Sequence, residues 1–410
     1  MWKRKLVKSN VKDCTGCELC SFLCKHIIME KDNEGFKYAR YDADACNHCG
    51  MCTRECPVSV PLKKVLSQSV YAVKNNNDNV RTNSSSGGMF SALATEVLNN
   101  NGAVYGAKFS GQVGNRFEVV HARITDIDDL PKLRGSKYVQ SNLKNTFAQA
   151  KNDILNGKQV LYVGTPCQIA GLKAYLKHVN TDNLILVDFV CHGVVSPKVW
   201  KSYVDWLESY YDKKLKLFNF RYKKNGWHGS KPAATFYDSD KVYFDVGPTD
   251  AFDDLFYSNK VLRPSCHNCK FTNFDRVGDI TLGDYWGIEN VMPQFDDNKG
   301  TSVVLVNSTK GNYMFNNVKN SLNFIKMSND QVYNNPLFRP TPVSSKRAQF
   351  WKDYNILPFN IVIKKHTAIG VKHKIIKLGK KMLKTTNLYA PLAKIVKKVL
   401  KWKTKLMQKN

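Results

Sequence analysis

A doubled run of cysteines near the N-terminus constrains this chain more than any other feature. Each run follows the spacing C-x-x-C-x-x-C-x-x-x-C, and the two runs consist of Cys14, Cys17, Cys20 and Cys24, and of Cys46, Cys49, Cys52 and Cys56. Two-residue gaps let one tight loop bring three thiolates to the corners of a 4Fe-4S cubane, while the fourth cysteine of each run ligates the other cluster. The spacing therefore predicts two 4Fe-4S clusters, one held by Cys14, Cys17, Cys20 and Cys56 and the other by Cys46, Cys49, Cys52 and Cys24. Zinc is the alternative, but zinc sites use paired C-x-x-C motifs without the additional cysteines.

The doubled run is the pattern of bacterial two-cluster ferredoxins. Four further cysteines lie far from it in the sequence. Cys167 follows the apolar run 160–163, Cys191 follows the apolar run 184–190, and Cys266 and Cys269 form a C-x-x-C after Pro264. The first two lie at the carboxyl ends of expected strands, where open α/β sheets place their ligands. Four thiolates are the complement of one more cluster, so we predict a third 4Fe-4S cluster at these cysteines. The alternatives are a zinc site at the C-x-x-C, or no metal and two cysteines of the core.

Two glycine-containing segments are candidates for a phosphate-bearing cofactor. Ser84–Gly88 precedes an apolar stripe at helical spacing, and free N–H groups at a helix start attract anions. The second segment, residues 134–141, includes Lys137 and Tyr138. Taken alone, the first segment is more typical of an ordinary helix cap and the second of a surface loop, and the sequence has no G-x-G-x-x-G or Walker A motif.

Composition narrows the class of protein. The chain has 410 residues, 43% of them apolar and 23% charged, with 12 cysteines. This cysteine density is well below that of a disulfide-rich secreted domain, and no window of 18 apolar residues occurs. We expect a reduced, cytoplasmic, multidomain protein whose cysteines are metal ligands or nucleophiles.

The net charge of +28 is concentrated at the C-terminus. No acidic residue follows Asp353, and fifteen lysines lie between Lys364 and Lys409. Apolar residues recur at helical spacing opposite these lysines, and Trp402 lies on the apolar face, a pattern typical of helices that bind anionic membrane surfaces. A packing helix with a solvated lysine face is the second interpretation. Nucleic acid is the third, and we do not expect it, because the tail has no arginine and few aromatic residues.

The remaining chain alternates strand-like and helix-like stretches, which predicts an α/β domain with a mixed sheet. We therefore expect an α+β and α/β multidomain protein with three parts: a ferredoxin-like module at residues 1–74, an α/β domain at residues 80–350, and a lysine-rich amphipathic helical tail at residues 360–410. The asparagine-rich stretch 75–79 is expected to be a linker.

In combination, these motifs resemble the coenzyme F420 hydrogenase/dehydrogenase beta-subunit family over residues 8 to 310. The resemblance is carried by the doubled cysteine run, by the segments around Gly87, Lys137, Cys167 and Cys191, and by Gly278–Gly287. The family consists of iron-sulfur flavoproteins, and bacterial relatives occur among polysaccharide-synthesis proteins. The resemblance supports the third cluster and implies FAD, with candidate contacts from Ser85, Ser86, Gly87, Gly88, Lys137 and Tyr138.

These features together predict an iron-sulfur flavoprotein oxidoreductase that passes electrons between 4Fe-4S clusters and FAD, to or from an organic substrate. A flavin exchanges one or two electrons and can join one-electron clusters to a two-electron substrate. His192, beside Cys191, is a candidate proton donor, with a hydrogen-bonded structural histidine as the alternative. The electron donor would be a redox partner protein or a small molecule, and the tail would attach the protein to the inner face of the membrane. The alternative function is a non-catalytic electron-carrier subunit.

Overall fold

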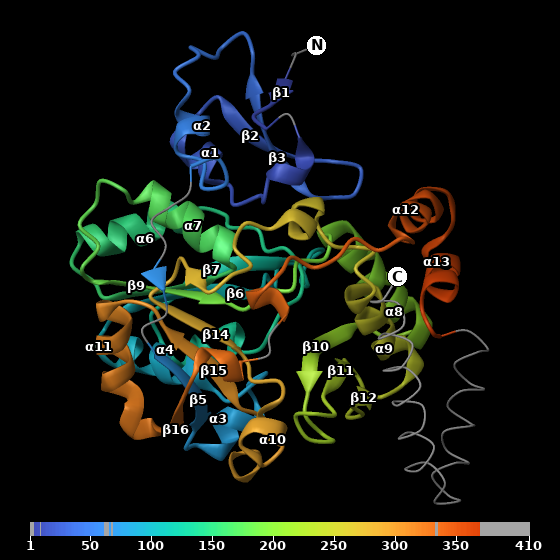
Figure 1. Ribbon diagram of the computed structural model, residues 1–410. Coiled ribbons are helices and arrows are strands. Elements are labelled where there is room, and N and C mark those ends of the chain that lie inside the picture. Colours follow the sequence, from blue (N-terminus) through green and yellow to red (C-terminus); the bar gives the residue numbers. More distant parts are fainter. Residues whose placement is uncertain (1–3, 9, 61–64, 67–68, 333–334, 370–410) are drawn as a thin grey trace, which may run out of the picture.

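The computed structural model describes residues 4–8, 10–60, 65–66, 69–332 and 335–369, and Figure 1 shows their arrangement. Most of the expected amphipathic tail, residues 370–410, lies outside the described residues. No helix of the described ranges is long and apolar enough to span a membrane.

Eight strands of the described chain form one mixed sheet at the centre of the molecule. Its four inner strands β14, β9, β8 and β6 run parallel, and the outer strands are antiparallel to their neighbours. The order across the sheet is β16 (Leu322–Met327), β5 (Ser69–Asn75), β15 (Ser302–Val306), β14 (Ile280–Asp284), β9 (Leu184–Phe189), β8 (Val160–Gly164), β6 (Ala103–Phe109) and β7 (Val119–Ile124). This arrangement confirms the predicted α/β domain with a mixed sheet.

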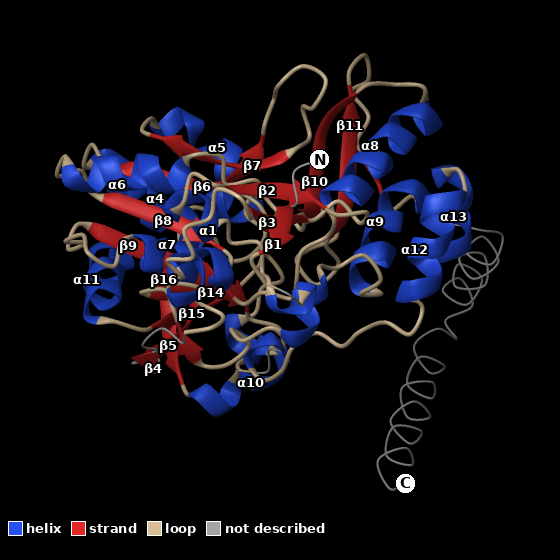
Figure 2. Ribbon diagram, turned by 90° about the horizontal axis from the view of Figure 1, so that it is seen from above, coloured by secondary structure: helices blue, strands red, loops and turns tan. Residues whose placement is uncertain are grey.

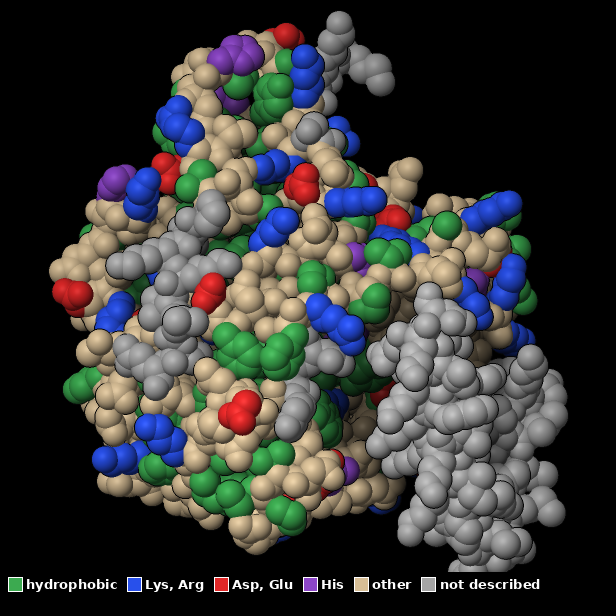
Figure 3. Space-filling model, viewed as in Figure 1, with side chains coloured by type: hydrophobic (Ala, Val, Ile, Leu, Met, Phe, Trp, Pro, Cys, Tyr) green, Lys and Arg blue, Asp and Glu red, His purple; other side chains and the backbone are tan. Residues whose placement is uncertain are grey.

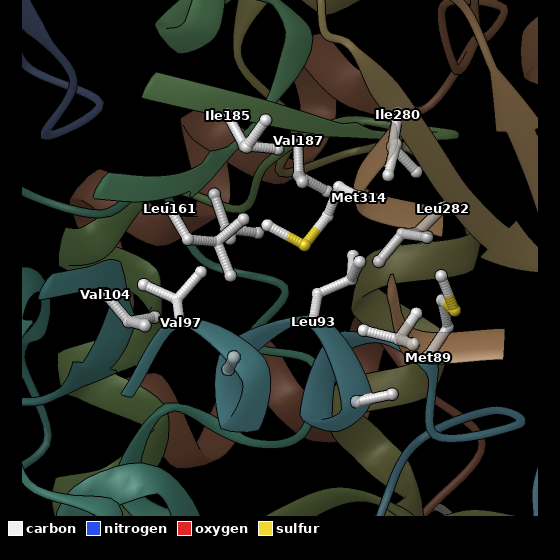
Figure 4. Close-up of a cluster of buried hydrophobic side chains, with 14 of the residues drawn as sticks. Met89, Leu93, Val97, Val104, Leu161, Ile185, Val187, Ile280, Leu282 and Met314 are labelled. Atoms are coloured by element: carbon white, nitrogen blue, oxygen red, sulfur yellow. The ribbon is translucent and has the colours of Figure 1, made fainter. Parts of the chain in front are cut away.

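Helices cover both faces of the sheet because successive strand residues point to opposite sides. In β6, Val104 packs on one face with Leu93 and Met314, as Figure 4 shows, whereas Tyr105 packs on the other face with Phe147. The first face carries α4 (Met89–Asn99), α5 (Leu130–Leu133) and α11 (Thr309–Val318), and the second carries α6 (Thr146–Leu155) and α7 (Pro166–Tyr175). Three short elements border the sheet: α3 (Asp78–Thr82), α10 (Ile288–Val291) and the strand pair β4 (Val65–Leu66) with β13 (Asp275–Arg276).

A second unit packs beside the sheet around an aromatic core. Trp200 lies at its centre, in contact with Phe109 of the main sheet and with Phe218, Phe220 and Phe252. The unit comprises α8 (Pro197–Tyr211), β10 (Leu215–Tyr222), β11 (Lys231–Phe236), β12 (Tyr243–Phe244), α9 (Gly247–Tyr257), α12 (Arg347–Ile356) and α13 (Phe359–His366). Helix α13 contains the first residues of the expected tail, but it buries Val362, Ile363 and His366 in this core.

The N-terminal residues form the expected ferredoxin-like module. It consists of β1 (Arg4–Leu6), α1 (Leu19–Leu23), β2 (Ile27–Lys31), β3 (Lys37–Asp42) and α2 (Met51–Arg54). The module rests on α7, and Figure 2 shows β1–β3 over the junction between the main sheet and the aromatic unit.

The structure corrects the expected boundary between the module and the α/β domain. Strand β5, placed in the module by the limit of residue 74, is instead paired on both sides within the main sheet. The expected linker 75–79 is also structured: Asn75 ends β5, and the Asn77 side chain caps α3 by accepting from the Val80 N–H at 3.1 Å. Asparagine is common in linkers, but it also caps helices, and the composition could not distinguish the two.

Candidate functional site

The first group of thiols surrounds a cavity in the ferredoxin-like module. Its lining includes the four cysteines predicted for the first cluster, Cys14, Cys17, Cys20 and Cys56. Gly16 has a φ of +69°, a backbone conformation that the tight cysteine loop requires. The described residues therefore offer four thiols around one pocket, which is the ligand number of a cubane.

The second group lies at the outer end of the module. Burial raises the pKa of the Cys52 thiol, and Cys46, Cys24 and Cys49 lie close enough for their charges to raise it further. These are the four cysteines predicted for the second cluster. Cys49 is exposed, so this group is the one nearer to solvent. Cys20 connects the two groups, because its Sγ lies 3.8 Å from the Cys52 carbonyl oxygen.

The third group gathers cysteines from three distant segments. Cys167 lies at the start of α7 and Cys191 follows β9, while Cys266 and Cys269 lie in and directly after a short 3-10 helix, Pro264–Asn268. Strands β8 and β9 are parallel neighbours, so the segments that follow them meet at the same sheet edge. Burial raises the pKa of Cys191 well above its usual value, and the charges of Cys266, Cys167 and Cys269 add to this. The structure thus brings together all four cysteines.

A buried ion pair supports the loops of the third group. Asp188, three residues before Cys191, is fully buried and accepts from Arg276 Nη2 at 2.9 Å. The same carboxylate accepts from Thr281 Oγ1 at 2.6 Å and from the Gly278 N–H at 3.1 Å. With the Val277 N–H as a fourth donor, each carboxylate oxygen accepts two hydrogen bonds, and this network fixes the end of β9 from which Cys191 projects.

The first and third groups are neighbours across the contact between the module and the α/β domain. Cys17 packs against α7 at Gly171, where a Cβ would lie 3.3 Å from the Cys17 Sγ. Cys17 is also close enough to Cys167 for the charge of that thiol to raise its pKa. The three groups therefore lie in series, joined by Cys52 with Cys20 and by Cys17 with Cys167.

The electrostatics of the thiols favour a bound cation. Burial, followed by the charges of neighbouring cysteines, raises the pKa of Cys20 to about 12, and burial raises that of Cys266 to about 11. Thiols crowded in this way stay protonated unless metal ions share their negative charge. This chemistry suits a metal centre at each group, and in the module the spacing of the cysteine runs is that of 4Fe-4S clusters, not of zinc sites.

The two segments predicted for a phosphate-bearing cofactor are also brought together. The Ser136 N–H donates to Ser85 Oγ at 2.7 Å. Some of the predicted atoms already have structural partners, since Ser86 Oγ donates to the Thr301 carbonyl and the Gly87 N–H donates to Ser302 Oγ. Gly88 caps α4 with a φ of +87°.

Lys137 and Tyr138 lie next to this turn but make different contacts. The Lys137 amine donates to three carbonyls at the end of α5, and burial lowers its pKa to about 7. The Tyr138 ring stacks on Phe256 with centroids 4.5 Å apart, and its hydroxyl lies 3.4 Å from Arg221 Nη1.

Sequence reasoning missed two basic residues near this turn, Arg221 in β10 and Lys223 directly after it. Lys223 Nζ donates to the Ser86 carbonyl at 2.7 Å, and burial lowers its pKa to about 7. Arg221 is 6% exposed and pairs with Asp284 at 3.1 Å, while its Nη2 is buried without a hydrogen-bond partner among the described residues. Isolated basic residues in a strand have no characteristic spacing, although Asp284 belongs to the Gly278–Gly287 motif. Of the two, Lys223 contacts the serine-glycine turn through the Ser86 carbonyl, whereas Arg221 reaches the Tyr138 hydroxyl.

His192 is hydrogen-bonded and packed against an aromatic ring beside the third group. Its Nε2 lies 2.9 Å from Asn259 Oδ1, and its ring packs on Phe256. Burial lowers its pKa, and the hydrogen bond to Asn259 opposes this shift. Its role as a proton donor stays a prediction.

Family models match most of the chain. Residues 13–60 match a 4Fe-4S dicluster domain. Residues 70–147 match the N-terminal model of the coenzyme F420 hydrogenase/dehydrogenase beta-subunit family, and residues 157–330 match the C-terminal model of the same family. The two beta-subunit models together cover more than half of the sequence. The chain belongs to the coenzyme F420 hydrogenase/dehydrogenase beta-subunit family. Membership confirms the resemblance found in the sequence and an iron-sulfur redox function.

One similar solved structure is a chain of the F420-reducing NiFe hydrogenase complex from Methanosarcina barkeri. It is 15% identical, with a TM-score of 0.43, over 79% of this chain and 95% of that chain. No curated protein sequence matches the chain.

Proposed function

We propose that this beta-subunit family member is an iron-sulfur flavoprotein oxidoreductase that passes electrons between three 4Fe-4S clusters and FAD, to or from an organic substrate. The observation that carries the proposal is the arrangement of the twelve cysteines. They form three groups of four in series, from the exposed Cys49 to the half-buried Cys191 at the sheet edge.

The proposed division of labour follows the chemistry of each group. Clusters move single electrons, and a flavin exchanges one or two, so the pair connects one-electron donors with two-electron substrates. The Cys167 group lies in the α/β domain, and the FAD phosphates would bind at the serine-glycine turn. Backbone and hydroxyl groups there would come from Ser85, Ser86, Gly87 and Gly88. Hydrogen-bond donors and positive charge would come from Lys137, Tyr138, Arg221 and Lys223.

The test is to purify the full chain without oxygen and to quantify iron and flavin. About twelve irons per chain and a releasable FAD are expected. Replacing Cys191→Ser should remove about four irons and leave eight, because only the third group loses a ligand. Twelve irons retained in Cys191→Ser would contradict the assignment of this group.

A non-catalytic electron-carrier subunit is the second candidate function. It is favoured by the exposure of Cys49, which places the outer group within reach of a partner, and by the beta-subunit description of the family. Eight irons without flavin in the purified chain would support it and exclude the flavoprotein proposal. Either function needs an external electron donor, a redox partner protein or a small molecule.

The setting and the substrate are proposed from the sequence resemblance. Bacterial relatives among polysaccharide-synthesis proteins support a substrate in that process, in the cytoplasm or on the inner face of the membrane. Anaerobic assay of the reconstituted protein with a panel of acceptors, including deazaflavin, tests this. His192 is the proposed proton donor. His192→Gln should then slow turnover without changing the iron or flavin content.

A further inference from the structure

Arg263 connects the first and third thiol groups and is completely buried. Its guanidinium reaches into the ferredoxin-like module, where Nε donates to the Cys14 carbonyl at 2.9 Å and Nη2 lies 3.7 Å from the Cys14 Sγ. Nη2 also donates to the Lys37 carbonyl at 2.9 Å, and Nη1 donates to Gln140 Oε1 at 2.8 Å. The side chain therefore spans the contact between the module and the α/β domain.

The backbone of the same residue holds the third group. The Arg263 N–H donates to the Val194 carbonyl at 3.0 Å, three residues after Cys191, and the Arg263 carbonyl accepts from the Cys266 N–H at 2.9 Å. Burial raises the pKa of both Cys167 and Cys266, and the positive charge of Arg263 lies close enough to oppose this rise. One residue thus contacts two of the three thiol groups, with its charge between them.

The burial of this charge requires an anion nearby. Among the described residues, the hydrogen-bond partners of Arg263 are carbonyls, an amide and a thiol, and none is a carboxylate. Burial raises the pKa of Glu18, and the charge of Arg263 is close enough to oppose this rise. The ion pair of Glu18, however, is with Lys37 at 3.6 Å. The ring of Tyr38 lies 4.3 Å from the guanidinium carbon and offers only a weak partial negative charge. An unpaired buried guanidinium is strongly unfavourable, whereas a thiolate-ligated cluster beside it supplies negative charge.

We propose that Arg263 is a positioning residue that raises the reduction potential of the cluster at Cys14, Cys17, Cys20 and Cys56. This inference rests on the proposed function, because it requires a cluster at that group. Reduction adds one electron from a low-potential donor and neither forms nor breaks a bond. The added negative charge is stabilised by the fixed guanidinium and by its N–H group directed at the Cys14 sulfur.

The test is a redox titration of the full chain, followed by electron paramagnetic resonance, with Arg263→Met. The step that is altered in Cys14→Ser identifies the first cluster. At the potential where that step is half complete in the unsubstituted protein, the ratio of reduced to oxidised cluster should fall about tenfold in Arg263→Met, equivalent to about 59 mV. Arg263→Lys keeps the charge but loses the planar fork, so a fall of about threefold is expected.

Arg347→Gln is the matched control. Arg347 also joins the module to the rest of the chain, through an ion pair with Glu34, but none of its contacts is a cysteine. This variant should leave all steps unchanged, so a shift equal to that of Arg263→Met would show that loosened docking, not the charge, sets the potential and would overturn the inference.

Unchanged steps in Arg263→Met with full iron would also overturn it. If Arg263→Met loses iron, Arg263→Lys decides, and an unshifted first-cluster step there refutes the inference. Fewer than about twelve irons in the unsubstituted chain would instead contradict the proposed function.

Discussion

His121 shows how a single buried side chain couples the edge of the sheet to the third thiol group. On β7, its Nδ1 lies 2.9 Å from Ser141 Oγ and its Nε2 lies 3.0 Å from the Val163 carbonyl. Ser141 in turn accepts from Gln168 Nε2 at 3.0 Å, next to Cys167. Because a carbonyl only accepts, Nε2 carries a proton, and in the neutral ring that burial favours, Nδ1 accepts from the Ser141 hydroxyl.

This geometry predicts a pH dependence of stability. Burial lowers the pKa of His121 from 6.5 to about 4, so the unfolded chain binds more protons than the folded one between these values. Stability is therefore fully present above pH 6.5 and falls as the pH decreases, by about 2 kcal/mol between pH 7 and pH 5. Thermal unfolding under anaerobic conditions, at several pH values, measures this loss.

The comparison needs variants because clusters are themselves acid-labile. His121→Gln lacks the titrating group and should show a shallower fall of the melting temperature with decreasing pH. His178→Gln, at an exposed position, should keep the steep fall of the unsubstituted chain. Equal slopes in all three proteins would contradict the assignment to His121.

Functional residues also differ in whether their roles can be predicted from the sequence. Cysteine ligands show a spacing that a cubane imposes on the local chain, so the two groups in the module could be assigned one cysteine at a time. Arg263, Arg221 and Lys223 have no such signature, because their partners lie far away in the sequence. Their roles depend on burial and on the direction of each side chain.

Among the elements, the turn before α4 joins three parts of the sheet layer. The Gly87 N–H donates to Ser302 Oγ on β15, and its carbonyl accepts from the Asn75 N–H at the end of β5. A Cβ at Gly87 would lie 2.2 Å from the Val73 carbonyl and 2.6 Å from the Ser302 N–H. Glycine is needed here because backbone approaches backbone, not because of a positive φ.

Replacing Gly87→Ala should therefore separate α4 from the sheet. We expect a loss of about 3 kcal/mol of stability, typical of an overpacked core position. Gly157→Ala is the control, because its Cβ would meet open space and only the φ of +75° opposes it, at a cost of about 1 kcal/mol. Urea unfolding of both variants measures the difference, and a Gly87→Ala midpoint at or above that of Gly157→Ala would refute the steric argument.

Most elements of the α/β domain were predictable because their apolar periodicity is strong. The apolar runs 160–163 and 184–190, for example, form the neighbouring strands β8 and β9. The stretch around Asn75 was not, since a buried asparagine at a strand end has the same composition as a linker. Only the pairing of β5 with β15 and β16 distinguishes them.

At the scale of the molecule, the lysine-rich tail differs from the folded body in how its charge is distributed. On the face drawn in Figure 3, lysine and arginine side chains are spread over the body with acidic side chains between them. The proposed membrane attachment therefore depends on residues 370–410, whereas α13 belongs to the aromatic unit through Val362 and Ile363.

Two truncations test this division. Deleting residues 371–410 should abolish co-sedimentation with anionic liposomes and leave iron content and melting temperature unchanged. Deleting residues 359–410 should also lower the melting temperature, because α13 is lost from the core. Liposome binding that is retained after deletion of residues 371–410 would contradict the membrane proposal. Neutral liposomes serve as the control for charge.

The sequence by itself determined the two-cluster module, the α/β class and the family, because each depends on local spacing or on repeated apolar patterns. The tertiary structure decided what distant segments do together. It joined Cys167, Cys191, Cys266 and Cys269 at one sheet edge, placed that group beside Cys17, and buried Arg263 between them. Such contacts follow from the order of strands and the docking of the module, and no local pattern in the chain encodes either one.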